Sequence, residues 1–329
     1  MEHRARYGVV LALLLLAVAG VLVIRPGKSA QKHSVTFPVM GTVASLTLYT
    51  DEATFKHAAA VVKAQFELVC RMADLHCETS ELSRLNRSAA EKAFVCSPGL
   101  WEILCEARLA HKFSEGAFDI SIKPLMDHWG FYRKKKQEIP PLQETMRIKS
   151  FTGLEKVVFN DLKRSVRFPR QGFALDLGGI AKGYAIETAC HTLEELGIRQ
   201  GVIDLGGNLR LLPEPPPGKK YYSIGIRRPS GKNGSVMPEI LHLPGNCAVS
   251  SSGDYERYVK IKGKIFGHII DPATGIPAPG KRAVTAVSGT GTRADWLSTA
   301  VYLRGGELAE KLKKELANTR FYIIEKENL

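Results

Sequence analysis

The sequence lacks the compositional marks of several common classes of protein. Of its 329 residues, 30 are glycine and 17 are proline, far fewer glycines than a collagen-like chain needs. Hydrophobic residues make up 44% of the chain, more than a wholly disordered protein contains. A polytopic membrane protein is excluded because only one long apolar run is present. The chain is therefore globular, with material for one large domain or two of ordinary size.

The sequence also lacks the pattern of a nucleic-acid-binding surface. Its 46 Lys and Arg against 33 Asp and Glu give a net charge of +13, but the excess is spread along the chain. The one local basic run, at residues 133–136, has no aromatic residues interleaved with it for stacking on bases. We interpret this run as a solvated loop rather than a binding patch and expect no nucleic-acid partner.

The cysteines form no CxxC pair, so neither a thioredoxin-like motif nor a sulfur-ligated metal site is expected. Six cysteines fit an oxidising compartment, but they allow many disulfide pairings. Buried free thiols are an equally good explanation. The residues concerned are Cys70, Cys77, Cys96, Cys105, Cys190 and Cys247.

The single apolar run lies at the N-terminus, at residues 7–24, and follows Arg4 and Arg6. About 18 apolar residues are enough to cross a bilayer. The preceding basic residues favour an N-terminus left in the cytoplasm. The small-residue cleavage signal after the run is poor, so we prefer an uncleaved signal anchor, residues 1–30, to a cleaved signal peptide. In either case residues 31–329 are expected to form one domain outside the cytoplasm.

Beyond the anchor, short strands and helices alternate along the chain. Helices are predicted at residues 53–72 after a cap at Asp51, at 98–113 after a cap at Ser97, at 180–196 and at 294–302. Strands are predicted on both sides of a bend at residues 40–42, at 173–177, 201–205, 222–226, 247–250, 284–287 and 321–324, with a hairpin at 255–270 turning at 262–263. The polar, proline-bearing residues 133–153 read as a surface excursion or subdomain junction. This mixture of short strands, hairpins and helices predicts an α+β fold with mainly antiparallel sheet.

The segment LDLGGIAKGY, residues 175–184, is the first candidate for chemistry. Asp176 is followed by two glycines that allow a ligand to approach the backbone, and then by a helix whose first N–H groups suit an anion. Lys182 can add a point charge to a phosphate. The glycine spacing fits neither a Walker A nor a dinucleotide fingerprint. Taken alone, a tight turn with a helix-capping Asp explains the segment equally well.

A second candidate is the predicted helix containing Asp295 and Thr299. These residues are four apart and share a face, where a carboxylate and a hydroxyl oxygen could bind a hard cation such as Mg²⁺. Taken alone, Asp295 as a charge near the helix N-terminus and Thr299 as a packed residue is the simpler explanation.

Two further segments place polar groups next to turns. His268 is followed by Asp-Pro and Thr-Gly turn chemistry, so its imidazole lies at a rim where it can accept a proton, although a lone His is more often structural. Phe118 and Asp119 follow a helix and set an aromatic ring beside a carboxylate. That arrangement suits a flat heterocycle but is also ordinary for a buried turn.

These four segments, together with residues 40–42 and 80–86, resemble the ApbE family of FAD:protein FMN transferases. The resemblance covers about residues 36–305 and rests on the blocks DLGGIAKGY, SGDYERY, HIIDPATGIP and ADWLSTA. It implies an α+β, T-fold-like architecture in which mainly antiparallel sheets pack with helices in two intertwined subdomains. The domain at residues 31–329 would then be the flavin transferase.

The resemblance implies Mg²⁺-dependent transfer of the FMN moiety of FAD to a Thr or Ser hydroxyl of a partner protein. The product would be a phosphoester-linked flavoprotein, with AMP released. The partner would be an exported or membrane-bound flavin acceptor, such as a respiratory or electron-transfer component. The enzyme would be anchored in the inner membrane with its domain facing the periplasm. Two alternatives are an FAD pyrophosphatase that forms FMN and AMP, and a non-catalytic FAD-binding module.

The resemblance also assigns residues. The cation would be held by Asp295, Thr299 and the backbone carbonyl of Gly179, and His268 would be the catalytic base. Many relatives carry a second Asp where this chain has Ser298, so we expect a lower metal affinity if that Asp is a ligand. His76 stands near where relatives often place a Tyr over the flavin. The residues implied to line the FAD site are Met40, Ala117, Phe118, Asp119, Asp176, Lys182 and Ile269.

Overall fold

The structure is a computed structural model that describes residues 31–132, 138–226, 239–253, 258–280 and 282–325. The predicted anchor at residues 1–30 and the basic run at 133–136 lie outside these ranges. Across the described residues, no helix is both long enough and apolar enough to span a bilayer. The anchor therefore stays a prediction.

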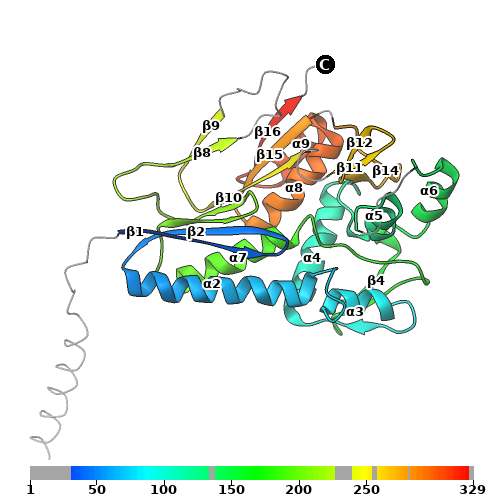
Figure 1. The fold of residues 1–329 in the computed structure, drawn as a ribbon, viewed down its shortest axis with the longest axis horizontal. Coiled ribbons are helices and arrows are strands. Elements are labelled where there is room, and N and C mark those ends of the chain that lie inside the picture. Colours follow the sequence, from blue (N-terminus) through cyan, green and yellow to red (C-terminus); the bar gives the residue numbers. More distant parts are fainter. Residues whose placement is uncertain (1–30, 133–137, 227–238, 254–257, 281, 326–329) are drawn as a thin grey trace, which may run out of the picture.

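Helices and strands alternate along the described chain (Figure 1). The helices are α2 (Glu52–Ala73), α3 (Glu81–Ser88), α4 (Pro98–Phe113), α5 (Lys123–Trp129), α6 (Leu142–Lys149), α7 (Ala181–Glu195), α8 (Gly291–Arg304) and α9 (Gly306–Glu315), with short 3-10 turns η1 (Ile120–Ile122) and η2 (Leu154–Lys156). The strands are β1 (Gln31–Val39), β2 (Thr42–Thr50), β3 (Phe94–Val95), β4 (Val158–Asn160), β5 (Ser165–Arg167), β6 (Gly201–Leu205), β7 (Asn208–Leu211), β8 (Tyr222–Ile226), β9 (Glu239–Leu243), β10 (Cys247–Gly253), β11 (Tyr258–Ile261), β12 (Lys264–Gly267), β13 (Ile270–Asp271), β14 (Ile276–Pro277), β15 (Arg282–Ser288) and β16 (Arg320–Glu325).

A seven-stranded sheet with the order β1-β2-β6-β7-β10-β15-β16 forms the centre of the fold, and its neighbouring strands pair antiparallel. Because side chains alternate along a strand, Ile203 and Leu205 of β6 enter the main core with the helices, whereas Val202 packs in a second cluster. The β8–β9 pair contributes to that second cluster and lies on the side of the sheet away from α2 (Figure 1). The predicted α+β class with mainly antiparallel sheet is confirmed.

Helix α2 shows how the local sequence determines where a helix begins and which face it buries. Asp51 Oδ1 accepts hydrogen bonds from the N–H groups of Ala53 and Thr54 at 3.1 and 3.2 Å, which satisfies donors at the start of the helix. Val62, Phe66 and Val69 recur at helical spacing and are almost completely buried in the main core. The predicted helix at residues 53–72 is confirmed, with each end one residue longer.

Helices α7 and α8 cross where two glycines meet. A Cβ added to Gly183 would lie 2.3 Å from the carbonyl oxygen of Gly291, so only glycine permits this approach. The helices also cap one another: Gly183 N donates to Asp295 Oδ2 at 2.8 Å, and Gly291 N donates to Glu187 Oε2 at 2.6 Å. Their N-termini are thus fixed side by side.

A smaller core forms beside the main one. Leu125, Met126 and Trp129 of α5 pack with Ile261 and Ile270 from the β11–β13 region. The β11–β12 hairpin turns at residues 262–263, as predicted. Both turn residues have positive φ. Ile261 and Ile270 flank His268 in the sequence, so this cluster holds the chain on both sides of that residue.

One predicted strand is wrong. Residues 173–177 have no regular secondary structure and pair with no described strand. Instead the side-chain amide of Asn86 bonds both backbone groups of Leu175, accepting from its N–H at 2.7 Å and donating to its carbonyl oxygen at 2.9 Å. The prediction of an irregular excursion at residues 133–153 is also partly wrong, because helix α6 lies within it. Helices α3 and α9 were not predicted.

Candidate active site

A cavity of about 450 Å³ is lined by segments that are far apart in the sequence. They are the β1–β2 turn, the end of α2, the residues around η1, the start of α7, the residues after β12, and α8. Its volume is in the range of small-molecule sites. Ten of the eleven residues proposed from the sequence line it: Met40, Ala117, Phe118, Asp119, Asp176, Gly179, Lys182, His268, Ile269 and Thr299. The eleventh, Asp295, lies behind the wall and is 5% exposed.

The aromatic and acidic pair Phe118 and Asp119 is held by backbone hydrogen bonds on one side of the cavity. Phe118 N donates to Ser114 Oγ at 2.9 Å. Asp119 Oδ1 accepts from Ser121 N at 2.7 Å and Oδ2 accepts from Leu154 N at 3.2 Å. Each carboxylate oxygen has a further lone pair. Asp119 can therefore accept a ligand's hydrogen bond while remaining fixed.

Asp176 is a buried carboxylate at the corner before α7. Its Oδ2 accepts from the hydroxyl of Tyr132 at 2.6 Å and its Oδ1 from Gly178 N at 2.8 Å. Burial raises the pKa of this carboxyl above its ordinary value, and the two hydrogen bonds partly oppose the rise. Lys182 lies in the first turn of α7 and lines the same cavity. The corner therefore combines an acceptor with a cation at a helix N-terminus.

Gly179, Thr299 and Asp295 converge at the same corner. A Cβ on Gly179 would lie 3.8 Å from Thr299 Oγ1. Gly183 N donates to Asp295 Oδ2 in place of the carbonyl oxygen of Gly179, four residues before it. Asp295 Oδ1 lies 3.5 Å from Ser250 Oγ, a distance at the limit of a hydrogen bond. The donor set consists of carboxylate, hydroxyl and carbonyl oxygens, which fits a hard cation such as Mg²⁺.

His268 follows β12 and lines the cavity next to Ile269. It is partly exposed. An imidazole in the cavity wall can accept a proton from a substrate bound there.

Comparison with known proteins identifies the family of the chain. The model of the ApbE family matches residues 40–323. The chain belongs to the ApbE family. It is 28% identical to the FAD:protein FMN transferase of Haemophilus influenzae over 306 residues, which cover 90% of this chain and 87% of that protein. It is 33% identical to the FAD:protein FMN transferase of Rhodobacter capsulatus over 309 residues, which cover 92% of this chain and 57% of that protein.

Two solved structures show that the ApbE architecture extends over nearly the whole chain. The flavin transferase ApbE from Vibrio cholerae superposes with a TM-score of 0.81 at 25% identity, covering 91% of this chain and 95% of that one. The ApbE protein from Thermotoga maritima gives 0.81 at 26% identity, covering 90% and 94%. The fold implied by the resemblance is confirmed.

Ser298, which follows Asp295 by three residues, lies in a buried hydroxyl cluster. Its Oγ donates to the carbonyl oxygen of Asp295 at 2.8 Å and lies 2.8 Å from Ser252 Oγ. Ser252 Oγ is also 3.3 Å from Thr299 Oγ1. Ser298 does not line the cavity. It therefore supports the two proposed ligands from behind.

His76, which the resemblance placed near the flavin, lines the cavity, and the ring of Tyr132 lies next to it. The rings of His76 and Tyr132 are 5.5 Å apart in an edge-to-face arrangement. Tyr132 also donates to Asp176, yet the sequence did not single it out. The tetrapeptide Trp129–Tyr132 has no helical or alternating pattern that would have revealed an inward-facing ring.

Proposed function

We propose that this ApbE chain is a Mg²⁺-dependent transferase that moves the FMN moiety of FAD to a Thr or Ser hydroxyl of a partner protein and releases AMP. The names of its relatives support this proposal. The observation that carries it is the convergence of five side chains on one cavity of about 450 Å³: Phe118, Asp119, Asp176, Lys182 and His268. Each of these groups has a role in binding or cleaving a dinucleotide.

The chain's own residues suit the parts of FAD. Phe118 offers an aromatic ring and Asp119 an acceptor for nucleotide donors. The N-terminus of α7, with Lys182 in its first turn, favours the negative charge of a diphosphate. These groups fix the dinucleotide with its phosphates at the corner formed by Gly179 and Thr299.

The cation is assigned to Asp295, Thr299 and the carbonyl of Gly179. When bound, Mg²⁺ would neutralise the negative charge that builds up on the phosphate of the AMP leaving group. The second carboxylate oxygen of Asp295 is held by Gly183 N, which keeps the side chain oriented in advance. The buried Ser252–Ser298 pair supports this arrangement.

His268 is assigned as the base. Its imidazole accepts the proton of the acceptor hydroxyl as the hydroxyl oxygen bonds to the phosphorus of the FMN half. The bond from that phosphorus to the AMP oxygen breaks, so the products are the flavinylated acceptor and AMP. The acceptor is proposed to be an exported or membrane-bound protein, because the predicted anchor places the transferase at the outer face of the inner membrane.

The test combines three readouts on the full chain with FAD, Mg²⁺ and a flavin-accepting domain. Transfer gives in-gel flavin fluorescence on the acceptor, together with AMP, and chelation with EDTA abolishes both. AMP formed at full rate without acceptor would establish hydrolysis instead. Intact FAD that copurifies and never turns over would establish a binding module. His268→Ala should slow transfer while FAD binding, measured by flavin fluorescence, persists.

A further inference from the structure

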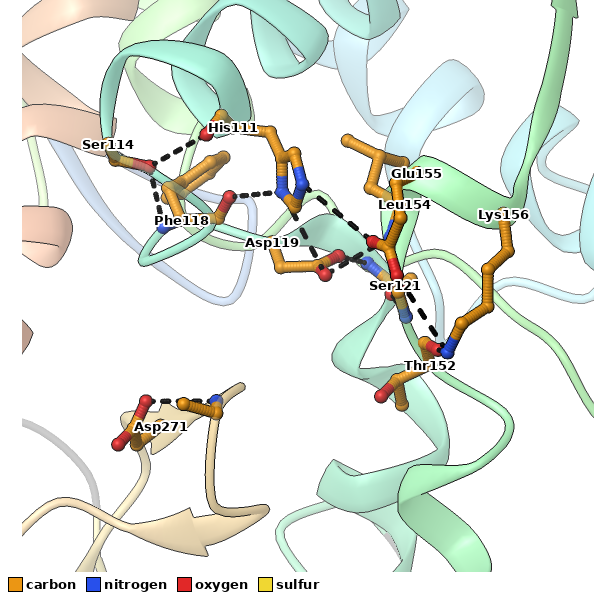
Figure 2. Close-up of polar contacts among 12 residues, drawn as sticks. His111, Ser114, Phe118, Asp119, Ser121, Thr152, Leu154, Glu155, Lys156 and Asp271 are labelled. Carbon is orange, nitrogen blue, oxygen red and sulfur yellow. Dashed lines mark hydrogen bonds and ion pairs between the residues drawn. The ribbon is translucent and has the colours of Figure 1, made fainter.

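A cluster of three metal-ligand side chains lies at the edge of the cavity, and the proposed function uses only one of them, Asp119, as a hydrogen-bond acceptor for FAD. His111 is in the last turn of α4, Asp119 precedes η1 and Glu155 is in η2 (Figure 2). One ligand atom from each lies within 4.8 Å of the others. Across the described residues, no second group of three His, Cys, Asp or Glu side chains meets this spacing. We propose that His111, Asp119 and Glu155 bind a divalent transition-metal ion of the Zn²⁺ class.

The hydrogen bond of His111 prepares its ring for a metal. Nδ1 lies 3.1 Å from the carbonyl oxygen of Phe118. A carbonyl carries no proton, so Nδ1 is the donor, and in the neutral ring Nε2 then holds the lone pair. Metal-binding histidines commonly donate their other ring N–H to a carbonyl or carboxylate in this way. Nε2 is 3.8 Å from Glu155 Oε2, too far for a hydrogen bond.

The two carboxylates differ in how tightly they are held. Asp119 is 7% exposed and is fixed by the N–H groups of Ser121 and Leu154. The Glu155 side chain is 61% exposed and turns back over the chain, so that a Cβ on Gly153 would meet its Oε1 at 2.5 Å. A fixed ligand and a mobile one allow the site to close on an ion that enters from solvent.

The spacing and charge are compatible with that closure. Ligand atoms around a tetrahedral Zn²⁺ lie about 3.4 Å apart, so the present separations, which reach at most 4.8 Å, need to contract by up to about 1.4 Å. Lys156 Nζ is 3.8 Å from Glu155 Oε1, but it also donates to the carbonyl oxygen of Thr152 at 2.6 Å (Figure 2). Movement of the exposed Glu155 side chain toward His111 therefore leaves Lys156 with a partner.

The ligand chemistry separates this site from the one assigned to Mg²⁺. An imidazole nitrogen with two carboxylates favours Zn²⁺ and its neighbours in the first transition row, whereas an all-oxygen set favours Mg²⁺. Asp119 also lines the cavity. An ion bound here would thus tie α4 and η2 together at the edge of the substrate cavity. The binding inference itself does not depend on the proposed function.

The experiment measures metal binding by the full chain, stripped of metal and without FAD, in the presence of excess Mg²⁺. Calorimetry with Zn²⁺ is expected to show one site, and Co²⁺ should give visible d–d absorption without the near-ultraviolet band of thiolate ligation. His111→Ala and Glu155→Gln should each lower the Zn²⁺ affinity by about tenfold or more. The matched control is His57→Ala, an exposed histidine on α2, which should leave the affinity unchanged.

Thermal unfolding with and without Zn²⁺ provides the second measurement. Zn²⁺ should raise the melting temperature of the parent chain and of His57→Ala, but not that of His111→Ala. The melting temperatures of the metal-free variants show whether each one folds, and Glu155→Gln changes only an exposed side chain. The proposal is overturned if Zn²⁺ does not bind while Mg²⁺ is present. It is also overturned if His111→Ala and Glu155→Gln bind Zn²⁺ as tightly as the parent chain does. A Co²⁺ spectrum with a thiolate charge-transfer band would overturn it as well.

Discussion

The carboxylate of Asp295 combines a structural and a proposed chemical task. One oxygen accepts the N–H of Gly183 at 2.8 Å, and the other lies 3.5 Å from Ser250 Oγ, while Thr299 lies one helical turn away on the same face of α8. Removal of the side chain leaves a buried N–H without a partner. Removal of the charge alone leaves that hydrogen bond in place.

We therefore expect Asp295→Asn and Asp295→Ala to separate the two tasks. The Asn variant should lose most Mg²⁺-dependent transfer while its free energy of unfolding changes little. The Ala variant should in addition lose about 1–3 kcal/mol of stability, since a buried donor is left unsatisfied. Urea unfolding and flavin transfer measured on both variants test this. Full activity in Asp295→Asn would show that the metal assignment is wrong.

Asp176 makes the stability of the fold depend on pH. Its burial raises the folded-state pKa above the ordinary value of 3.8, so the folded state binds the proton more tightly than the unfolded state does. Its contribution to stability is therefore greatest below pH 3.8 and declines as the pH rises toward the raised value.

Asp176→Asn should remove this dependence. Relative to the variant, the parent chain should become progressively less stable as the pH rises from 3.8 through the raised pKa of Asp176. Urea midpoints for the two chains across that range give the comparison. A difference that stays constant with pH would show that the carboxyl is not perturbed.

The cysteines, all six of which are free thiols, should differ in reactivity. Burial raises the pKa of Cys96 and of Cys190 to about 12, so neither forms the thiolate near neutral pH. Hydrogen bonds with Thr79 lower the pKa of Cys77. Brief alkylation followed by peptide mass spectrometry should label Cys77 first, and Cys96 and Cys190 only after unfolding. Early labelling of Cys190 would contradict the packing of α7.

At the scale of elements, the crossing of α7 and α8 builds the corner of the active site. The backbones touch at Gly183 and Gly291, and each helix supplies a carboxylate that caps the other. Glu187, which caps α8, is itself paired with the buried Arg210 at 3.0 Å. Any separation of the two helices therefore displaces Asp295 and Thr299 from Gly179.

Gly291→Ala should force that separation. The added Cβ would lie 2.5 Å from the carbonyl oxygen of Gly183 and 2.6 Å from Ile186 Cγ1. We expect a loss of about 1–3 kcal/mol in the free energy of unfolding and weaker Mg²⁺ dependence of transfer. Gly289→Ala is the matched control, because nothing lies within 4 Å of its Cβ position. Equal stability of the two variants in urea would refute the close-contact explanation.

At the scale of the whole molecule, residues from the main core and from the smaller core around Trp129 both line the cavity. The main core holds residues 117–118 and the α7–α8 corner, while the smaller core around Trp129 carries the chain to His268. Trp129 Nε1 donates to the carbonyl oxygen of Gly275 at 2.9 Å, which fixes the loop that follows His268 against α5. Relative movement of the two cores would change the distance between the proposed base and the proposed cation ligands.

The predicted anchor also belongs to the molecule as a whole. In cell fractionation, the full chain should sediment with membranes, whereas a chain beginning at residue 31 should remain in the supernatant. The shortened chain should keep its transfer activity on a soluble acceptor, since it retains all the residues that line the described cavity, from Met40 to Leu303. N-terminal sequencing of the sedimented protein distinguishes an anchor from a cleaved signal. Equal sedimentation of both chains would show that attachment lies elsewhere.

Local patterns in the sequence predicted the helices well. Caps at Asp51 and Ser97 and apolar residues at helical spacing involve residues only a few positions apart, so α2 and α4 could be placed from sequence alone. The strand predicted at residues 173–177 is wrong because the backbone of Leu175 bonds to the side chain of Asn86, which lies 89 positions away. No local pattern encodes such a contact.

The tetrapeptide Asp-Leu-Gly-Gly, which occurs twice, marks the boundary between the two kinds of information. In both copies the Asp side chain accepts a backbone N–H from a following glycine at 2.8 Å. At residues 204–207 both glycines have positive φ and turn β6 into β7, whereas at 176–179 the chain enters α7 beside the cavity. The sequence alone determined the turns, the helices and the motif set of the ApbE family. Only the tertiary structure brought Gly183 to Asp295, 112 positions apart, because that contact depends on two helix backbones packing at glycines.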